Sequence, residues 1–491
     1  MLTTATAALT TFGSTSPDNM KCSYGERGSL TATCFNANPP YFRATPYRFD
    51  QLDETVKCQN CTLKTIEAGT FDISGNQIKI LVLNDSKIEN IRPKGFVGLI
   101  FLEELVLSHN EIRSIYPNTF IGIKKIKSID LSHNQLNILS DDGFLELVNM
   151  EELNLETNSI QTIAAYAFHG LSKLKNLNLK NNKIRELQKV LTNLTSLQLL
   201  NLENNHLQSL NGDEFLNLTS LSELNLSNNK LASPVIELKP NNQLRSLQLR
   251  SNLIVSLAPQ FLKGLHALEL LDLSYNQVGT VEHKVLHSLF SLRDLNLAYN
   301  GLRSLQTGTF SALPQLEVLN CSHNSIVVVE ITGVFSLHSL HALDLSHNLM
   351  TDLDYVALID RLPRLSYLRL EHNLLPCGLE DEMETYFQED NFKFVLSEAG
   401  NGTSMCLDEP PKKSLQVVDV VAASAENLSS RVTGAEITIM VLMSVVFMCI
   451  GFLFFMQYRT YQEVRSRSSK RSISTSHLMA AEAERNEDGY P

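Results

Sequence analysis

Cysteine is the residue type whose spacing in this 491-residue chain could most directly do chemistry. Four cysteines precede a long leucine-rich stretch and two follow it: Cys22, Cys34, Cys58, Cys61, Cys377 and Cys406. A zinc site is one use for the first four, but the wide gaps on either side of Cys34 and a glycosylation sequon beside the Cys-x-x-Cys pair disfavour it. Disulfides are the other use, and four cysteines allow three connectivities that the sequence alone does not separate.

Catalysis is the next chemistry to consider, and no catalytic arrangement appears. Histidines recur in Ser-His-Asn triplets and one related copy: His109, His133, His323, His347 and His372. Their recurrence marks them as repeat positions that face solvent where a strand leads into a turn. The motifs G-x-S-x-G and H-E-x-x-H and a phosphate-binding loop are absent from the sequence. We therefore expect no enzyme, no cofactor and no metal site.

The charge balance bears on the class of partner. The chain has 41 Lys plus Arg against 53 Asp plus Glu, a net charge of −12. A general nucleic-acid binder needs a basic face that displaces counterions, so we expect no nucleic-acid partner. Apolar residues make up 43% of the chain and charged residues 19%, which excludes a wholly disordered protein.

A repeat with the frame L-x-x-L-x-L-x-x-N fills the middle of the chain. Its asparagines recur at a nearly constant spacing, at Asn110, Asn134, Asn158, Asn182, Asn205, Asn229, Asn252, Asn276, Asn300, Asn324, Asn348 and Asn373. A weaker copy with Ser86 in the asparagine place precedes them, and an opening copy has Cys61 there. The pattern predicts thirteen repeats and a cysteine-bearing opening copy.

This frame resembles the leucine-rich-repeat family, in its 24-residue extracellular type, over residues 52–406. A phenylalanine that recurs about ten residues after the asparagine supports the resemblance, at Phe71, Phe96, Phe120, Phe144, Phe168, Phe215 and Phe310. Leucine takes its place at Leu191, Leu238, Leu286 and Leu358.

The physics of the repeat follows from its spacing. Leu-x-Leu is a short strand whose leucines point inward, while the residue between them faces the concave surface. The asparagine satisfies backbone groups where the chain leaves the strand, and the phenylalanine fills the outer side of the core. No repeat buries its apolar face alone, so the repeats must stack. The expected fold is an α/β solenoid, a horseshoe with a concave parallel β-sheet.

Two departures from the frame lead to predictions about local structure. Pro234 and Pro240 fall in one copy and would break a helix on its convex side. Cys321 takes an inward strand position, where a buried small hydrophobe is the better interpretation than a ligand or a nucleophile.

A solenoid exposes its core at both ends and needs caps. The family resemblance implies cysteine-closed caps in residues 22–77, which include the opening repeat, and in residues 375–410, on either side of thirteen repeats at 78–374. Residues 375–396 resemble the C-terminal cap of insect leucine-rich-repeat proteins. Within that cap Cys377–Cys406 is the only pairing available. Residues 1–21 are predicted to be a disordered N-terminal segment.

Residues 437–456 carry no charge and, at about 1.5 Å per residue, suffice for one transmembrane helix. A buried globular helix is the alternative, but such helices rarely run so far without a polar face. The linker at 411–436 is neutral, whereas the tail at 457–491 begins with a net charge of +4 over residues 458–471. The positive-inside rule predicts a single-pass type I plasma-membrane protein with an extracellular N-terminus. The first residues lack the features of a signal peptide, which we attribute to a missing first exon.

Eight glycosylation sequons support this topology, because all of them precede the apolar segment. They are Asn60, Asn84, Asn193, Asn217, Asn225, Asn320, Asn401 and Asn427.

Function is expected to reside on the concave surface. The residues between the inward leucines are mostly polar and uncharged, so no large apolar patch marks an obligate interface. Candidate ligand contacts on this surface are Arg245, Arg250, Tyr275, Tyr299 and Arg369, of the types enriched at binding hot spots. The tyrosines are equally compatible with plain repeat variation.

The sequence thus predicts a non-enzymatic cell-surface protein that binds an extracellular or cell-surface protein, in adhesion and recognition or in receptor signalling. The alternatives are an innate-immune recognition co-receptor and a regulator that sequesters a ligand without signalling. A homodimer and a co-receptor complex both stay open.

Overall fold

The computed structural model describes residues 21–24, 28–43, 52–257, 260–282, 284–305, 308–330, 337–387 and 393–395. All of them belong to one compact unit, Met1–Glu409. The predicted transmembrane segment, its flanking linker and tail, Cys406, Asn401 and Asn427 lie outside the described residues. Within the described residues no helix has both the length and the apolar character needed to cross a bilayer.

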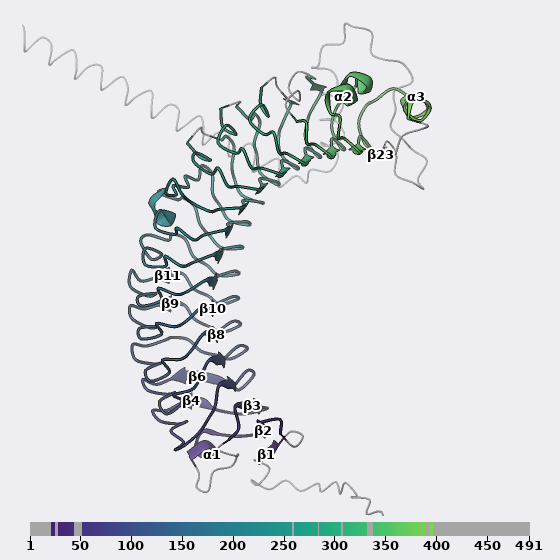
Figure 1. Ribbon diagram of the computed structural model, residues 1–491. Coiled ribbons are helices and arrows are strands. Elements are labelled where there is room, and N and C mark those ends of the chain that lie inside the picture. The colour runs from purple at the N-terminus through teal and green to yellow at the C-terminus, as the bar shows by residue number, and fades with distance from the viewer. Residues whose placement is uncertain are drawn as a thin grey trace, which may run out of the picture. The chain divides into compact units, whose positions relative to one another are not determined.

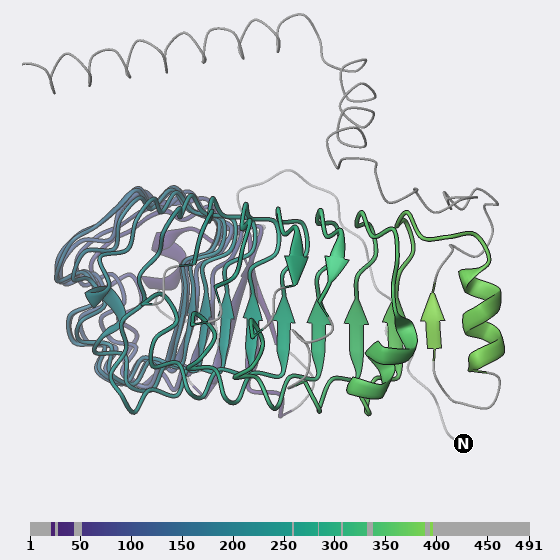
Figure 2. The same ribbon diagram turned by 90° about the horizontal axis from the view of Figure 1, so that it is seen from above.

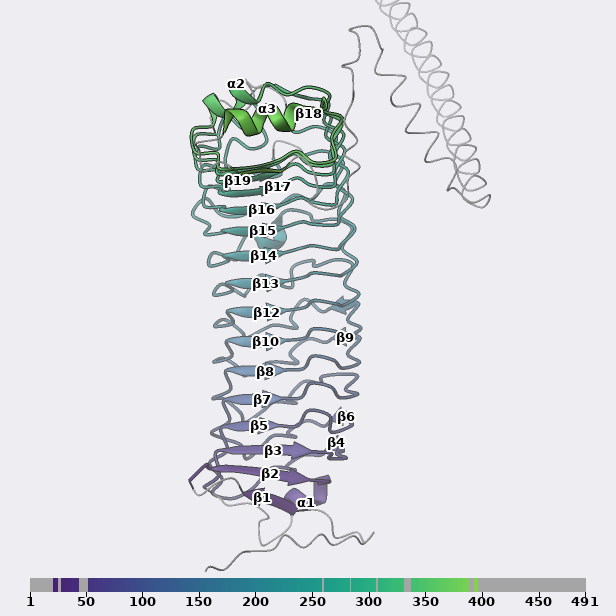
Figure 3. The same ribbon diagram turned by 90° about the vertical axis from the view of Figure 1, so that its right-hand side faces the viewer.

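Thirteen three-residue strands form the inner side of the solenoid, one per predicted repeat (Figure 1). They are β5 (Ile80–Val82), β7 (Glu104–Val106), β8 (Ser128–Asp130), β10 (Glu152–Asn154), β12 (Asn176–Asn178), β13 (Leu199–Asn201), β14 (Glu223–Asn225), β15 (Ser246–Gln248), β16 (Leu270–Asp272), β17 (Asp294–Asn296), β19 (Val318–Asn320), β21 (Ala342–Asp344) and β22 (Tyr367–Arg369). Each pairs in parallel with the next (Figure 3). Their inward leucine or isoleucine residues lie side by side in the register, as Leu153 and Leu177 do. The predicted parallel sheet is confirmed.

The consensus asparagines form the predicted ladder. Asn110 donates from Nδ2 to the carbonyls of Leu83 and Leu107, both at 2.9 Å. Its Oδ1 accepts from the backbone N–H groups of Ser86 at 3.0 Å and Ile88 at 2.9 Å. One buried side chain therefore satisfies backbone groups of its own coil and of the preceding coil, where the strand has already ended.

The outer side of the core is a stack of phenylalanines. All seven predicted members are buried, and the rings of Phe71, Phe96, Phe120 and Phe144 follow one another at 5.8 to 5.9 Å between centroids. Cys321 is fully buried and free, as expected for a small hydrophobe, and burial raises the pKa of its thiol.

The convex side is mostly turns with a few short elements (Figure 2). These are β4 (Lys64–Ile66), β6 (Ile88–Ile91), β9 (Ile138–Leu139), β11 (Thr162–Ile163), β18 (Ser304–Leu305), β20 (Val328–Val329), the 3-10 helix η1 (Asp213–Phe215) and α2 (Tyr355–Arg361). The copy with Pro234 and Pro240 has no helix on this side and forms only an isolated bridge between Gly212 and Ile236. Since most other copies also lack a helix there, the effect expected of the prolines stays a prediction.

The N-terminal cap consists of β1 (Lys21–Tyr24), β2 (Thr31–Phe35), α1 (Pro39–Arg43) and the opening strand β3 (Thr55–Gln59). Strands β1 and β2 are antiparallel and place Cys22 opposite Cys34, which form a disulfide. Cys58 and Cys61 form the second disulfide. Of the three connectivities the structure therefore selects one, and the zinc alternative is wrong because all four sulfurs are bonded in pairs.

The described part of the C-terminal cap is α3 (Leu379–Tyr386) and β23 (Lys393–Val395), which pairs with β22. Leu379 and Met383 lie one helical turn apart and are buried, so α3 covers the open end of the core. Phe387 follows the helix and packs against Phe394, with 6.0 Å between ring centroids. Cys377 is disulfide-bonded. Its pairing with Cys406 stays a prediction, since Cys406 is outside the described residues.

Candidate binding surface

The side chains between the inward leucines turn back toward the protein's own backbone. Asn154 Oδ1 accepts the N–H of Glu156 at 3.1 Å, and Asp272 Oδ1 accepts the N–H of Ser274 at 2.8 Å. The same turn occurs at Asp130, Asn178, Asn201, Asn225, Asn296, Asn320 and Asp344. A short polar side chain can close such a turn where the strand ends. These residues are half-buried on the inner face, and the protein's own backbone occupies their acceptor atoms.

A second row of side chains lies at the edge where the strands end, immediately before each consensus asparagine. The backbone there is left-handed, with φ of 56° at Tyr275, 54° at Tyr299 and 52° at His323. Because every coil repeats this conformation, equivalent side chains leave the turn in the same direction. Aromatic residues in neighbouring coils must therefore meet face to face.

Five of these rings form one continuous pile, here called the ring stack: Tyr275, Tyr299, His323, His347 and His372. Successive centroids are 4.0, 3.9, 3.9 and 4.1 Å apart. A shorter pair, His109 and His133, stacks at 4.2 Å nearer the N-terminus. Sequence reasoning assigned the histidines to equivalent repeat positions and named the two tyrosines as candidate contacts, but it did not place both types in one stack. The shared position immediately before the consensus asparagine was the signal that could have joined them.

Burial and neighbouring groups shift the ionisation of the stack. Partial burial lowers the pKa of the His323 and His347 imidazoles. For His347 the neighbouring rings of His323 and His372 lower the pKa further. At the other end, a hydrogen bond with Tyr275, reinforced by burial, raises the pKa of Tyr299. His323 and His347 are therefore held toward their neutral form.

The predicted arginine contacts differ in what they touch. Arg245 forms an ion pair with Glu269 in the next coil. Arg369 bonds Asp344 at 3.3 Å and also Glu371, which is only 1% exposed. Arg250 instead lies over the Tyr275 ring, with its guanidinium carbon 4.1 Å from the centroid, and donates to Ser274 Oγ at 3.3 Å.

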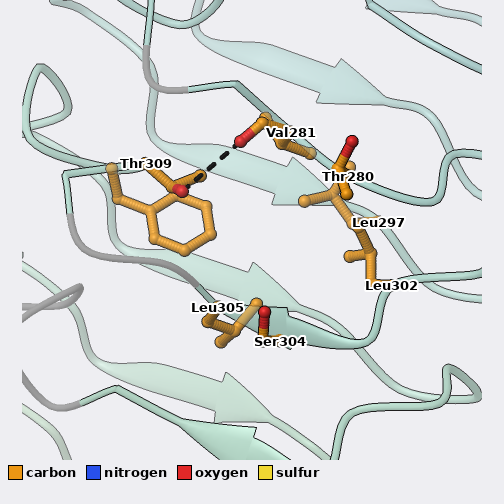
Figure 4. A pocket seen from close by; sticks show the side chains of 8 residues that line it. Thr280, Val281, Leu297, Leu302, Ser304, Leu305 and Thr309 are labelled. Atoms are coloured by element: carbon orange, nitrogen blue, oxygen red, sulfur yellow. Dashed lines mark hydrogen bonds between the residues drawn. The ribbon is translucent and has the colours of Figure 1, made fainter.

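Two small cavities lie in the described part of the molecule. The one between the coils near Phe310 holds about 10 Å³, and Thr309 Oγ1 donates across it to the Val281 carbonyl at 3.4 Å (Figure 4). A hollow of about 100 Å³ lies on the inner face over β13–β15. Both are below the roughly 300 Å³ at which small-molecule pockets begin. Among the described residues no group of three or more His, Cys, Asp or Glu is placed to hold a metal ion.

The sequons of the described residues lie on different surfaces. Asn60 and Asn193 are exposed, whereas Asn84 and Asn217 are half-buried. Asn225 and Asn320 are also half-buried and lie on the inner face, in β14 and β19. Asn225 donates from Nδ2 to Glu203 at 3.3 Å.

Comparison with known proteins identifies the repeat. The family model described as "Leucine rich repeat" matches residues 76–136, 136–184, 242–302, 290–350 and 322–375. No curated protein sequence matches the chain.

Solved structures share the fold at low sequence identity. A chain of the Toll–Spatzle complex of Drosophila has a TM-score of 0.59 at 20% identity, covering 70% of this chain and 51% of that one. This chain thus spans about half the length of that relative. The leucine-rich-repeat domain of APL1 has a TM-score of 0.59 at 22% identity, covering 75% and 94%. A leucine-rich-repeat protein of Leptospira interrogans has a TM-score of 0.51 at 22% identity, covering 70% and 95%. Repeat frame, parallel-sheet solenoid and family model together make this chain a leucine-rich-repeat protein.

Proposed function

We propose that the chain is a single-pass, insect-like type I surface protein that binds an extracellular protein through its repeat domain. Its role would be in cell adhesion and recognition or in receptor signalling. The observation that carries the proposal is the ring stack with Arg250 at its end, on the edge of the inner face. Tyrosine and arginine at an exposed edge are residue types on which protein interfaces depend.

The shape of the surface favours a macromolecular partner over a small molecule. Two cavities of the described residues, one of them on the inner face, are far smaller than a ligand pocket, whereas the inner face itself runs along thirteen strands. A protein partner needs an extended surface of about 800 Å² rather than a deep pocket. The Toll–Spatzle complex, by its name, pairs a protein of similar fold with a protein ligand.

The test is a binding screen with the full-length chain expressed on cells. Tagged ectodomains from a defined library of secreted and surface proteins are applied, and binding is compared with cells that carry the vector alone. We expect at least one library protein to bind saturably. Failure of every library protein to bind, with the chain shown at the cell surface by an antibody, would contradict the proposed function.

Topology needs its own measurement. We expect an antibody against residues 52–387 to stain intact cells and one against residues 457–491 to stain only after permeabilisation. A variant that lacks residues 437–491 and carries an added signal peptide should be released into the medium. Retention of that truncated form on membranes after an alkaline wash would show that 437–456 is not the anchor.

A further inference from the structure

Arg250 occupies the N-terminal end of the ring stack. It lies two residues after β15, and its guanidinium covers the face of Tyr275 in the next coil at 4.1 Å. A guanidinium over a tyrosine ring gains cation–π attraction and loses rotational freedom. Arg250 is nevertheless exposed, so its charge is held in one place at the surface.

Most ion pairs of the inner face join a cation to a carboxylate of an adjacent coil. At the edge where the strands begin, Lys127 pairs with Glu103 at 2.6 Å and Arg293 with Glu317 at 2.7 Å. Arg245, in the same repeat as Arg250, pairs with Glu269. Arg250 has no carboxylate within ion-pair distance among the described residues. Its guanidinium donates to the neutral Ser274 Oγ, and its positive charge is not matched by a carboxylate.

The neighbours of Arg250 make a compact contact surface. Tyr275 and Tyr299 are each 39% exposed, while Ser274 and Ala298, which precede them in the chain, are buried and take no part in the surface. Since the ring faces are covered by one another, the stack offers outward ring edges and hydroxyl groups. This surface suits flat polar and apolar contact around a central ion pair.

A protein carboxylate is the acceptor that fits best. An anionic membrane or a nucleic acid would need several free cations in a row, because affinity for such polyanions grows with each neutralised charge. In the next coil, Asp272 lies opposite Gln248, two residues before Arg250, and it is acidic. A single guanidinium on a tyrosine ring at the end of the stack is instead an arrangement that suits one Asp or Glu side chain of a partner protein.

We propose that Arg250, held on the ring of Tyr275, receives a carboxylate of the partner protein, with the edge of the ring stack as the surrounding contact. The proposal rests on the proposed function and specifies the partner as a protein with an acidic side chain at the centre of its contact surface.

The test uses purified full-length protein in detergent and the library ectodomains that bind it. Affinity is measured for the unchanged chain, Arg250→Ala, Arg250→Lys and Arg293→Ala. We expect Arg250→Ala to weaken binding on the order of 10-fold or more, as for loss of a charged hydrogen bond. Arg250→Lys should fall in between, because an ammonium keeps the charge but loses the planar stacking. Arg293→Ala, which removes an arginine paired with Glu317, is the matched control and should stay within about 2-fold.

Charge reversal identifies the chemistry of the contact. Arg250→Glu should abolish binding, and changing the partner's contacting Asp or Glu to Lys should restore it. Thermal unfolding of each variant confirms that the repeats remain folded. Equal effects of the Arg250 and Arg293 substitutions, or no effect of either, would overturn the inference while leaving the proposed function intact. If no library protein binds the unchanged chain, both the inference and the proposed function are contradicted.

Discussion

Tyr299 and His323 stack with 3.9 Å between their ring centroids, although a full coil of the solenoid separates them in the chain. The contact exists because both occupy the left-handed position before the consensus asparagine, where coil geometry places equivalent side chains one strand spacing apart. Tyr275 and His347 extend the contact on either side. A backbone repeat thereby builds a surface feature that no single repeat contains.

The ring stack makes stability depend on pH. In the folded protein burial lowers the pKa of His323 and His347 below the ordinary value of 6.5. Asp344 and Glu371 oppose this shift for His323, whereas Arg369 and His372 reinforce it. The neutral rings thus stabilise the fold fully above pH 6.5, and this contribution is lost as the pH falls from there through the lowered folded-state pKa.

We therefore expect thermal stability to decline between about pH 7 and pH 5, and to decline less in the double variant His323→Asn, His347→Asn. Asparagine is tolerated at this position, since Asn181, Asn204 and Asn228 already occupy it. The matched control is His109→Asn, His133→Asn, because that pair stacks where both rings are exposed. Thermal unfolding followed by circular dichroism provides the measurement. A pH response unchanged by the first pair of substitutions would contradict the prediction.

The buried consensus asparagines and the half-buried polar residues between the inward leucines should contribute unequally to stability. Asn158 is buried, donates to the carbonyls of Leu131 and Leu155 at 3.0 and 3.1 Å, and accepts from Leu136 N–H at 3.0 Å. Asn158→Ala leaves these buried groups unsatisfied and should cost about 2–5 kcal/mol of unfolding free energy. Asn154→Ala removes one half-buried turn contact and should cost about 1 kcal/mol. Urea unfolding of both variants compares them, and an equal loss would mean that the consensus asparagine has no special role.

The solenoid itself was predictable because its physics is local and repeated. A leucine pair that recurs at a nearly constant interval has one stable solution, which is a strand stacked on the strands of adjacent coils. The buried Phe71, Phe96 and Phe120 follow from the same argument. The absence of a helix expected at Pro234 and Pro240 also depends only on what proline does to a helix.

Features that depend on side chains meeting across coils were harder to foresee. Nothing in the spacing of Cys22, Cys34 and Cys58 shows that β1 runs antiparallel to β2 and thereby joins the first two. Arg245 and Arg250 are alike in sequence, and only the identity of the facing residue, Glu269 or Tyr275, separates a paired charge from an unpaired one. Helix α2 replaces the turns that other repeats use, with Asp354 capping its first turn by accepting from Ala357 N–H.

Cys377 should be joined to Cys406. The bond would close a loop of about 30 residues and contribute roughly 3–4 kcal/mol by restricting the unfolded chain. Mass spectrometry of non-reduced peptides from the secreted repeat domain should find this crosslink together with Cys22–Cys34 and Cys58–Cys61. The buried Cys321 supplies an internal reference that should stay a free thiol. Free thiols at both Cys377 and Cys406 would rule the pairing out.

Glycosylation should avoid the surface around Arg250. Asn225 is directly opposite Gln248 in the β14–β15 register, and Gln248 precedes Arg250 by two residues. A glycan on Asn225 would cover several strand spacings of the inner face and exclude a protein partner there. If Arg250 is a partner contact, Asn225 should be unoccupied, while the exposed Asn60 and Asn193 should carry glycans.

Glycopeptide mapping of the mature protein, site by site, measures this occupancy. Removal of the sequon by Ser227→Ala is the control, and it should leave partner binding unchanged because no sugar is lost. Asn320 tests the same reasoning four strands away: a glycan there would shield the face beside Tyr299 and His323, so it too should be empty. Full occupancy of Asn225 and Asn320 together with binding that Arg250→Ala weakens would show that a partner reaches Arg250 past the sugars, and that glycans do not decide which part of the inner face is used.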